Sequence, residues 1–317
     1  MKQQTKKQHY VPRLLLRNFC FKNTQKVYVF DKEKEINFIS NITNILHENN
    51  FYSFQLLGKE TCIEEFFIPL ETQASPIIQK ILTDESLINL TNNDIICLSK
   101  FSIIQMFRTK YAIESYMHIS REFLRKAKKI IKSNHNLNPI DSCLPDEVDY
   151  NSAKIGTMTM VIEMCEKFVP RLLDMDWLLF STTSQFPFWI SDNPVTLHND
   201  HTFGPYGNLG ICVPGIQLSI PLSPKFTLCI WDKKNISDMF RYSILKPNKN
   251  NNVDRILNGY MTKMPISCSP DNVIFYNSLQ VVFSERFLIS DRKEWGLVEN
   301  MISEDKRYKK GLRSQFI

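Results

Sequence analysis

The sequence predicts an α+β fold, in which N-terminal and C-terminal strands form a mixed or antiparallel sheet core around a mainly helical central region. Short strand-like runs occur near the start of the chain and again after Asp176, and helical periodicity fills the interval between them. The chain has 317 residues, of which 43% are hydrophobic and 23% are charged. This composition supplies a sizeable core and excludes a wholly disordered chain or a collagen-like fibre.

The N-terminal strand region is expected to span residues 8–53. Apolar and polar residues alternate over 35–40, and an apolar run lies at 27–30, with charged turn residues between them. Residues 50–53 are a plausible third strand.

Residues 61–173 are expected to be mainly helical. Apolar side chains recur at helical spacing over 61–82, where Pro69 and Pro76 should kink or split the helix. A cap signal at 91–94 begins a second helical pattern that continues to about Lys132. A third helix is expected from Ser152 to Leu173.

Strands return between residues 176 and 231, and helices follow between 249 and 290. The expected strands lie at 177–180, 188–190, 217–220 and 226–230, and the expected helices at about 249–264 and 271–285. We find no internal repeat and no low-complexity linker. The chain is therefore expected to be a single domain, residues 1–317, that ends in a basic tail and has one core shared by its two ends.

The net charge of +6 is unevenly distributed. Residues 1–35 hold nine Lys or Arg against three acids, a difference of +6, and further clusters lie at 121–132 and 306–313. Clustered cations bind phosphates through counterion release. A solvated helix face and a frayed tail explain the same clusters.

The cysteines and the lengths of the apolar runs indicate the compartment in which the protein is expected. Eight cysteines form no CxxC pair, the start is polar and basic, and no apolar run is long enough to span a bilayer. We therefore expect reduced thiols, a cytoplasmic protein and no membrane partner.

The opening His9-Tyr10-Val11-Pro12 places an imidazole and a phenol before a proline that restricts the backbone. Histidine is suited to proton transfer near neutral pH. On residues alone, a structural histidine that satisfies a buried carbonyl is the better interpretation.

A second segment, Trp189-Ile190-Ser191-Asp192-Asn193-Pro194, ends an apolar strand in polar residues. Polar groups at such strand ends commonly build sites and can bind metal, orient water or bind a ribose. A turn that only terminates the strand is the simpler interpretation.

These motifs resemble an uncharacterised bacterial family, the domain of unknown function DUF4238. The resemblance continues in sequence order through Phe30-Asp31-Lys32, Asn50-Phe51-Tyr52, Glu64-Glu65-Phe66, Gln105-Met106-Phe107-Arg108-Thr109, Ser191-Asp192-Asn193-Pro194 and Pro221-Leu222-Ser223-Pro224. It covers residue 8 to about residue 290. It implies no established chemistry, and its bacterial context suggests accessory or defence genes.

The matched positions are polar and far apart in sequence, so we expect them to converge on one pocket. His9, Asp192, Asn193 and Arg108 are the predicted catalytic residues, with His9 and Asp192 in the same pocket. The predicted substrate-binding residues are Tyr10, Arg13, Arg17, Gln105, Glu65, Lys126 and Lys129. Imidazole, carboxylate and guanidinium groups together suit acid–base or phosphoryl chemistry.

The chain lacks a P-loop, a GxGxxG motif and a GxSxG elbow. His198-Asn199-Asp200-His201 has the spacing of metal ligands but lacks the glutamate of an HExxH motif. We therefore assign no metal-binding residues, and the sequence leaves open whether the protein uses a divalent metal.

The first functional hypothesis is a bacterial effector enzyme, nuclease-like and acting in phage defence or as a toxin, with RNA, DNA or a nucleotide as substrate. The alternatives are a non-catalytic interaction module whose polar motifs form a buried structural network, and a small-nucleotide hydrolase or sensor. The sequence does not fix the oligomeric state.

Overall fold

The computed structural model describes residues 6–56, 58–133, 144–204, 207–246 and 251–313. Its helices are α1 (Arg13–Leu16), α2 (Glu64–Asp84), α3 (Asn92–Phe107), α4 (Lys110–Ser133), α6 (Tyr150–Leu173), α7 (Lys233–Leu245), α8 (Asn251–Thr262), α9 (Pro270–Phe283) and α10 (Gly296–Glu304), with short 3₁₀ turns at Arg17–Phe19 and Lys306–Lys309. The fold is α+β, as the sequence predicts.

The strands form two main sheets and two small ribbons. They are β1 (Lys7–His9), β2 (Lys26–Asp31), β3 (Ile36–Asn41), β4 (His47–Asn49), β5 (Ser53–Leu56), β6 (Lys59–Cys62), β7 (Asp176–Ser181), β8 (Ile190–Ser191), β9 (Thr196–His198), β10 (Gln217–Pro221), β11 (Phe226–Trp231), β12 (Ile266–Ser267) and β13 (Phe287–Ser290). The sheet orders are β12-β7-β11-β10-β9 and β3-β2-β13-β8, and the ribbons are β1-β4 and β5-β6.

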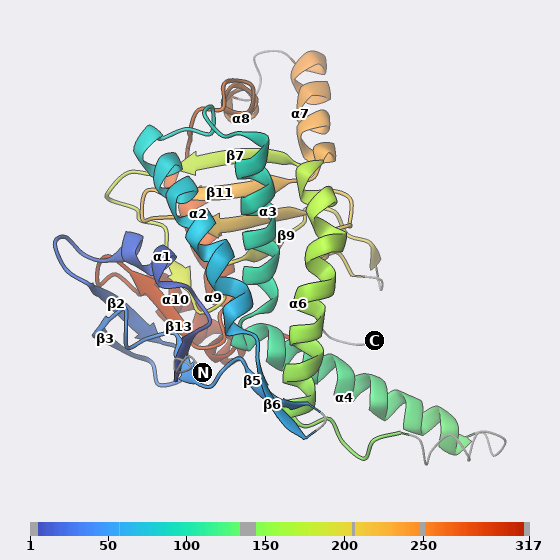
Figure 1. Ribbon diagram of the computed structural model, residues 1–317. Coiled ribbons are helices and arrows are strands. Elements are labelled where there is room, and N and C mark those ends of the chain that lie inside the picture. The colour runs from blue at the N-terminus through green and yellow to red at the C-terminus, as the bar shows by residue number, and fades with distance from the viewer. Residues whose placement is uncertain (1–5, 57, 134–143, 205–206, 247–250, 314–317) are drawn as a thin grey trace.

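The five-stranded sheet is buried on both faces, which explains the continuous apolar runs of β7 and β11. Trp177 and Leu179 face a core shared with α2, α3 and α6, whereas Leu178 and Phe180 pack against residues of α7, α8 and α9. Successive side chains of a strand point to opposite faces, so both sets of positions must be apolar. Figure 1 shows α2, α3 and α6 in front of this sheet.

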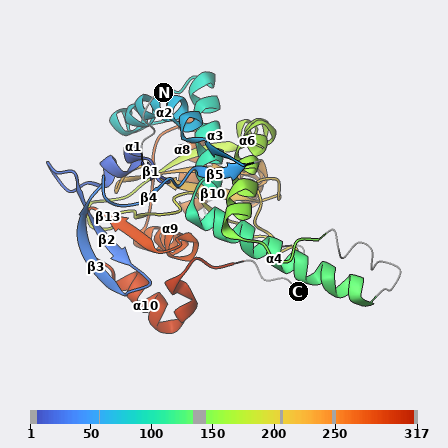
Figure 2. The same ribbon diagram turned by 60° about the horizontal axis from the view of Figure 1, so that its bottom comes forward.

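The two ends of the chain share one core, and the N-terminal strands β2 and β3 share a sheet with the later strands β13 and β8 but not with β7, β10 and β11. The largest hydrophobic cluster joins Val27 and Val29 of β2 to Leu218 of β10 and Leu228 of β11. The N-terminal strands nevertheless pair with β13, and β13 pairs with β8. The second sheet packs against α9 and α10 (Figure 2) through a separate cluster around Phe30 and Trp295.

Several predicted boundaries are wrong. The long pattern after Thr91 is two helices, because α3 ends at Phe107 and α4 starts at Lys110. α2 is not split, although it contains Pro69 and Pro76. The predicted strand at 50–53 is mainly the turn between β4 and β5, while α7, α10 and β13 had no sequence prediction.

Candidate functional site

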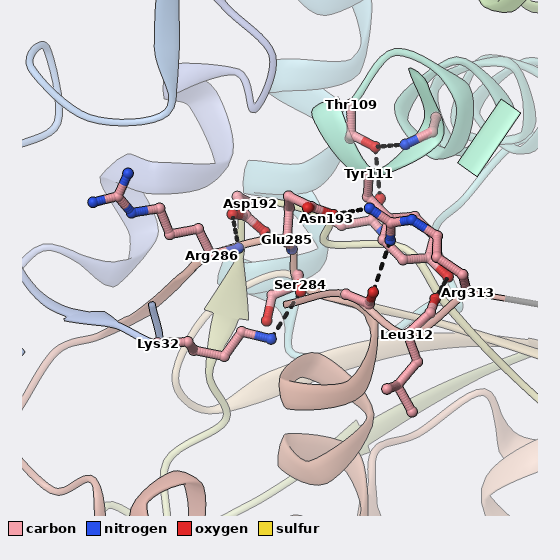
Figure 3. Close-up of polar contacts among 12 residues, drawn as sticks. Lys32, Thr109, Tyr111, Asp192, Asn193, Ser284, Glu285, Arg286, Leu312 and Arg313 are labelled. Carbon is pink, nitrogen blue, oxygen red and sulfur yellow. Dashed lines mark hydrogen bonds and ion pairs between the residues drawn. The ribbon is translucent and has the colours of Figure 1, made fainter. Parts of the chain in front are cut away.

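Asp192 lies directly after β8 and binds the backbone at the turn between α9 and β13 (Figure 3). Its carboxylate accepts three amide hydrogen bonds, from Glu285 at 2.7 Å, Arg286 at 2.7 Å and Phe287 at 2.8 Å. The side chain is 2% exposed. A buried carboxylate with three backbone donors is bound by the chain itself, so its main contacts are structural.

Lys32, directly after β2, supports the same turn from the other side of β13. Its ammonium donates to the carbonyls of Val281 at 2.7 Å and Ser284 at 2.8 Å. Burial lowers the pKa of Lys32 to about 8, while the charge of Asp192 opposes that shift. Burial also raises the pKa of Asp192 to about 6, against the effect of its amide donors and Lys32. The two buried charges therefore stabilise each other across the turn.

Asn193 and Ser191 connect the same segment to two helices. The Asn193 side-chain oxygen accepts from the hydroxyl of Thr109, at the junction of α3 and α4, at 2.8 Å. Ser191 donates to Gln280 of α9 at 2.6 Å. The Ser-Asp-Asn segment thus joins α9, β13 and the α3–α4 junction; we call these bonds the Asp192 clamp.

Arg108 and Gln105 form a second buried network at the end of α3. The Arg108 guanidinium donates to Gln105 at 2.9 Å and to Glu71 of α2 at 2.7 Å. Gln105 in turn donates to the backbone carbonyl of Tyr10 at 2.9 Å. Arg108 is only 1% exposed, and its Nη2 has no hydrogen-bond partner among the residues that the structure describes. Through Tyr10 this network positions the segment that carries His9.

His9 lines a cavity of about 580 Å³, hereafter the His9 cavity, between α2 and the start of the chain. Its Nε2 lies 3.2 Å from the carbonyl oxygen of Ile42. A carbonyl only accepts, so Nε2 carries the hydrogen and Nδ1 retains its lone pair. Burial, with the neighbouring His47, lowers the pKa of His9 to about 4. The imidazole is therefore neutral near pH 7 and able to accept a proton.

Three cations line the His9 cavity: Lys7, Arg13 and Arg17. Arg13 begins α1 after Pro12, and Arg17 lies four positions later, so one helical turn presents both guanidinium groups on the same side. Both arginines are exposed, and none of the three cations has an ion pair within the described ranges. Two carboxyl groups, of Glu64 and Glu71, line the same cavity, and Glu71 is paired with Arg108. The three cations form no ion pair with either, so they suit an anionic ligand.

Acids and carbonyls complete the opposite wall of the His9 cavity. Burial raises the pKa of Glu64, which accepts a hydrogen bond from Gln8 at 3.2 Å. Pro76 of α2 lacks the amide that would bond to the carbonyl of Thr72, and both residues line the cavity. The cavity thus combines a neutral imidazole, a carboxyl group that retains its proton more readily than usual, and unpaired cations.

A second cavity of about 570 Å³ contains Asp192 and Tyr10 but not His9, so the expectation that His9 and Asp192 share one pocket is wrong. Three of the lysines and arginines that line it have carboxylate partners: Lys110 bonds Glu48 at 2.9 Å, Arg286 bonds Asp31 at 2.6 Å and Arg313 bonds Glu285 at 2.5 Å. The fourth, Lys310, has no ion pair within the described ranges. His47 also lines it, and its ring lies 5.1 Å from that of His9 across the β1–β4 pair. His47 was not identified from the sequence. Its place beside His9 follows from the register of the β1–β4 pair, in which the two histidines lie opposite each other.

The remaining predicted substrate residues lie elsewhere. Glu65 is exposed on α2 and does not line the His9 cavity, and Lys126 and Lys129 lie on the part of α4 that extends from the body (Figures 1 and 2). Four cations of the basic tail, Lys306, Arg307, Lys309 and Arg313, are ion-paired, for example Lys309 with Glu35.

No group of three His, Cys, Asp or Glu side chains in the described ranges could hold a metal ion. In the HxxH segment, His198 instead bonds Asp200 at 2.8 Å. Likewise, no described helix is long and apolar enough to cross a membrane.

These features define an α+β protein with a cation-lined cavity and two buried polar networks. A family profile described as "Protein of unknown function (DUF4238)" matches residues 7–294, and the chain belongs to this family. Searches of curated proteins and of solved structures found no match.

Proposed function

We propose that the protein binds a nucleotide or a nucleic-acid end in the His9 cavity and hydrolyses a phosphoester bond there. The observation that carries this proposal is the convergence of Lys7, Arg13 and Arg17, which form no ion pair within the described ranges, around a neutral imidazole. A volume of about 580 Å³ lies within the range of small-ligand sites.

The proposed roles follow from the chemistry of the side chains. Arg13 and Arg17 bind phosphate oxygens, which guanidinium groups do in a bidentate manner. His9 accepts the proton of the attacking water or hydroxyl through Nδ1 while the phosphorus–oxygen bond to the leaving group breaks. Arg108 does not line the cavity, so its proposed role is to position the Tyr10 backbone through Gln105.

A panel of mononucleotides, dinucleotides and short RNA and DNA strands, with and without Mg²⁺, tests this proposal. His9→Gln should lower the rate on the active substrate about 10²-fold or more, because general-base catalysis contributes that much. His198→Gln, at the end of β9 and outside the cavity, is the matched control and should leave the rate unchanged. Equal rates in both variants would remove His9 from the mechanism. If expression of the wild type arrests bacterial growth, His9→Gln should relieve the arrest.

The second candidate is a non-catalytic interaction module. It is favoured by the burial of Asp192, Asn193, Gln105 and Arg108, whose polar groups bind other parts of the chain. Under this hypothesis neither the wild type nor any variant of the His9 cavity hydrolyses a phosphate compound, and these variants are as stable as the wild type. The substrate panel distinguishes the two candidates.

A further inference from the structure

The second half of α4 projects from the body of the protein in both views (Figures 1 and 2). We call residues 119–133 the α4 arm. The inner side of the helix is fixed to the body, since Ile113 and Ile131 are buried and Arg121 donates to the carbonyl of Val148 at 3.0 Å. The opposite side faces outward.

An apolar stripe runs along this outward side. Ile119 is 44% exposed, Phe123 is 73% exposed and Ile130 is 60% exposed. Successive residues of a helix turn by about 100°, so positions separated by four and seven residues fall on one narrow stripe. Large apolar side chains aligned in this way on a projecting helix mark an interaction surface.

Cations lie beside and behind the stripe: at about 100° per residue, Lys129 lies to one side of Ile130, and Lys132 lies on the opposite side of the helix. The arm holds six cations and one acid, a difference of +5, and the acid, Glu122, is paired with Arg125. Lys129 and Lys132 are exposed. Arg121 and Lys128 donate hydrogen bonds to the backbone carbonyls of Val148 and Asp146, in the segment before α6. Because carbonyl groups carry no net charge, these bonds do not cancel the positive charges of the two side chains. The arm as a whole is therefore strongly basic, and it is apolar along its outward stripe.

The apolar stripe and the positive charge of the arm together indicate which kind of partner it binds. A second copy of the arm would carry the same positive charge and be repelled. A nucleic acid would use the cations and could stack a base on Phe123, but it would leave Ile119 and Ile130 in water. An anionic lipid surface uses both, because apolar side chains enter the boundary between headgroups and acyl chains while lysines bind the headgroups.

We propose that the α4 arm docks the protein onto an anionic lipid surface, with Phe123 inserted below the headgroups. The arm lies on the bilayer and does not span it. This inference is independent of the proposed function of the His9 cavity, and it departs from the sequence-based expectation of no membrane partner.

The test is co-sedimentation with vesicles of phosphatidylcholine alone and of an equal mixture of phosphatidylcholine and phosphatidylglycerol. The full-length protein should bind the mixed vesicles, and added salt should weaken the binding. Phe123→Ser should weaken it about tenfold. Lys129→Glu combined with Lys132→Glu should weaken it about thirtyfold or more, since each basic residue adds about 1 kcal/mol at such a surface. Ile244→Ser on α7, where Ile244 is 78% exposed, and Lys59→Glu are matched controls that should bind like the wild type.

Thermal melts establish that each variant is folded, and Ile130→Ser replaces Phe123→Ser if the latter is not. Failure of the wild type to bind the mixed vesicles would overturn the proposal, as would equal binding by folded stripe variants. A stripe-dependent dimer without vesicle binding would assign the surface to a second copy. Oligonucleotide binding that needs Lys129 but not Phe123, again without vesicle binding, would assign it to nucleic acid.

Discussion

The His9 cavity and the Asp192 clamp both contain polar residues from the family motifs, but they differ in how those residues are satisfied. At the clamp, the Asp192 carboxylate accepts three backbone amides and is buried. At the cavity, Arg13 and Arg17 are exposed and lack ion pairs within the described ranges. The comparison teaches that a saturated polar group stabilises a fold, whereas unsatisfied charges around a cavity are available to a ligand.

The largest expected effect is loss of stability at the clamp. Asp192→Ala leaves three amide groups without their acceptor and removes the negative charge that stabilises the buried Lys32 ammonium. It should therefore lower the free energy of unfolding by about 3–5 kcal/mol. Denaturant unfolding measures this change. Glu60→Ala, at an exposed carboxylate of β6, is the control and should change stability by less than about 0.5 kcal/mol. If Asp192→Ala is as stable as the control, the clamp is not structural.

A smaller loss is expected at Arg108. Arg108→Met removes the hydrogen bonds to Gln105 and Glu71, and we expect a cost of about 2–3 kcal/mol because Glu71 is partly exposed. Arg125→Met removes an exposed pair with Glu122 and should cost less than about 0.5 kcal/mol. Thermal unfolding of the two variants side by side checks the difference; equal melting temperatures would contradict it.

The sequence predicted which residues gather at the His9 cavity better than it predicted the contacts of Asp192. His9, Arg13 and Arg17 lie within nine residues, so a short turn after Pro12 is sufficient to place them at one cavity. The partners of Asp192 are backbone amides more than 90 positions away, which leave no side-chain signature in the sequence. The α+β class and shared core followed from periodicity, whereas the α3–α4 break did not, because apolar spacing continues across Arg108 and Thr109.

A third prediction concerns the protonation of His9 on ligand binding. Lys7 and Arg13 contribute to its lowered pKa, so a bound phosphate that offsets their charge should raise that pKa. Binding then takes up a proton, and affinity for a dinucleotide should increase as the pH falls from about 6.5 toward about 4, by at most tenfold per pH unit. Calorimetric titration across this range measures the trend. His9→Gln should flatten the profile, whereas His198→Gln should not; an unchanged profile in His9→Gln would exclude His9 as the titrating group.

The smallest expected effect is on salt dependence. If Arg17 neutralises one phosphate, Arg17→Gln should reduce the slope of log K against log salt for single-stranded nucleic acid by about 0.7. Lys22→Gln, at a nearby exposed lysine outside the cavity lining, is the control and should leave the slope unchanged. Equal slopes in all three proteins would place the phosphate contact elsewhere.

The most direct test of the central claim is calorimetric titration of wild type and of the double variant Arg13→Gln, Arg17→Gln with the phosphate compound that the wild type binds best. The account predicts at least a tenfold loss of affinity with a melting temperature within a few degrees of wild type, because both side chains are exposed and unpaired. Unchanged affinity in the folded double variant would contradict the claim that these cations bind the ligand.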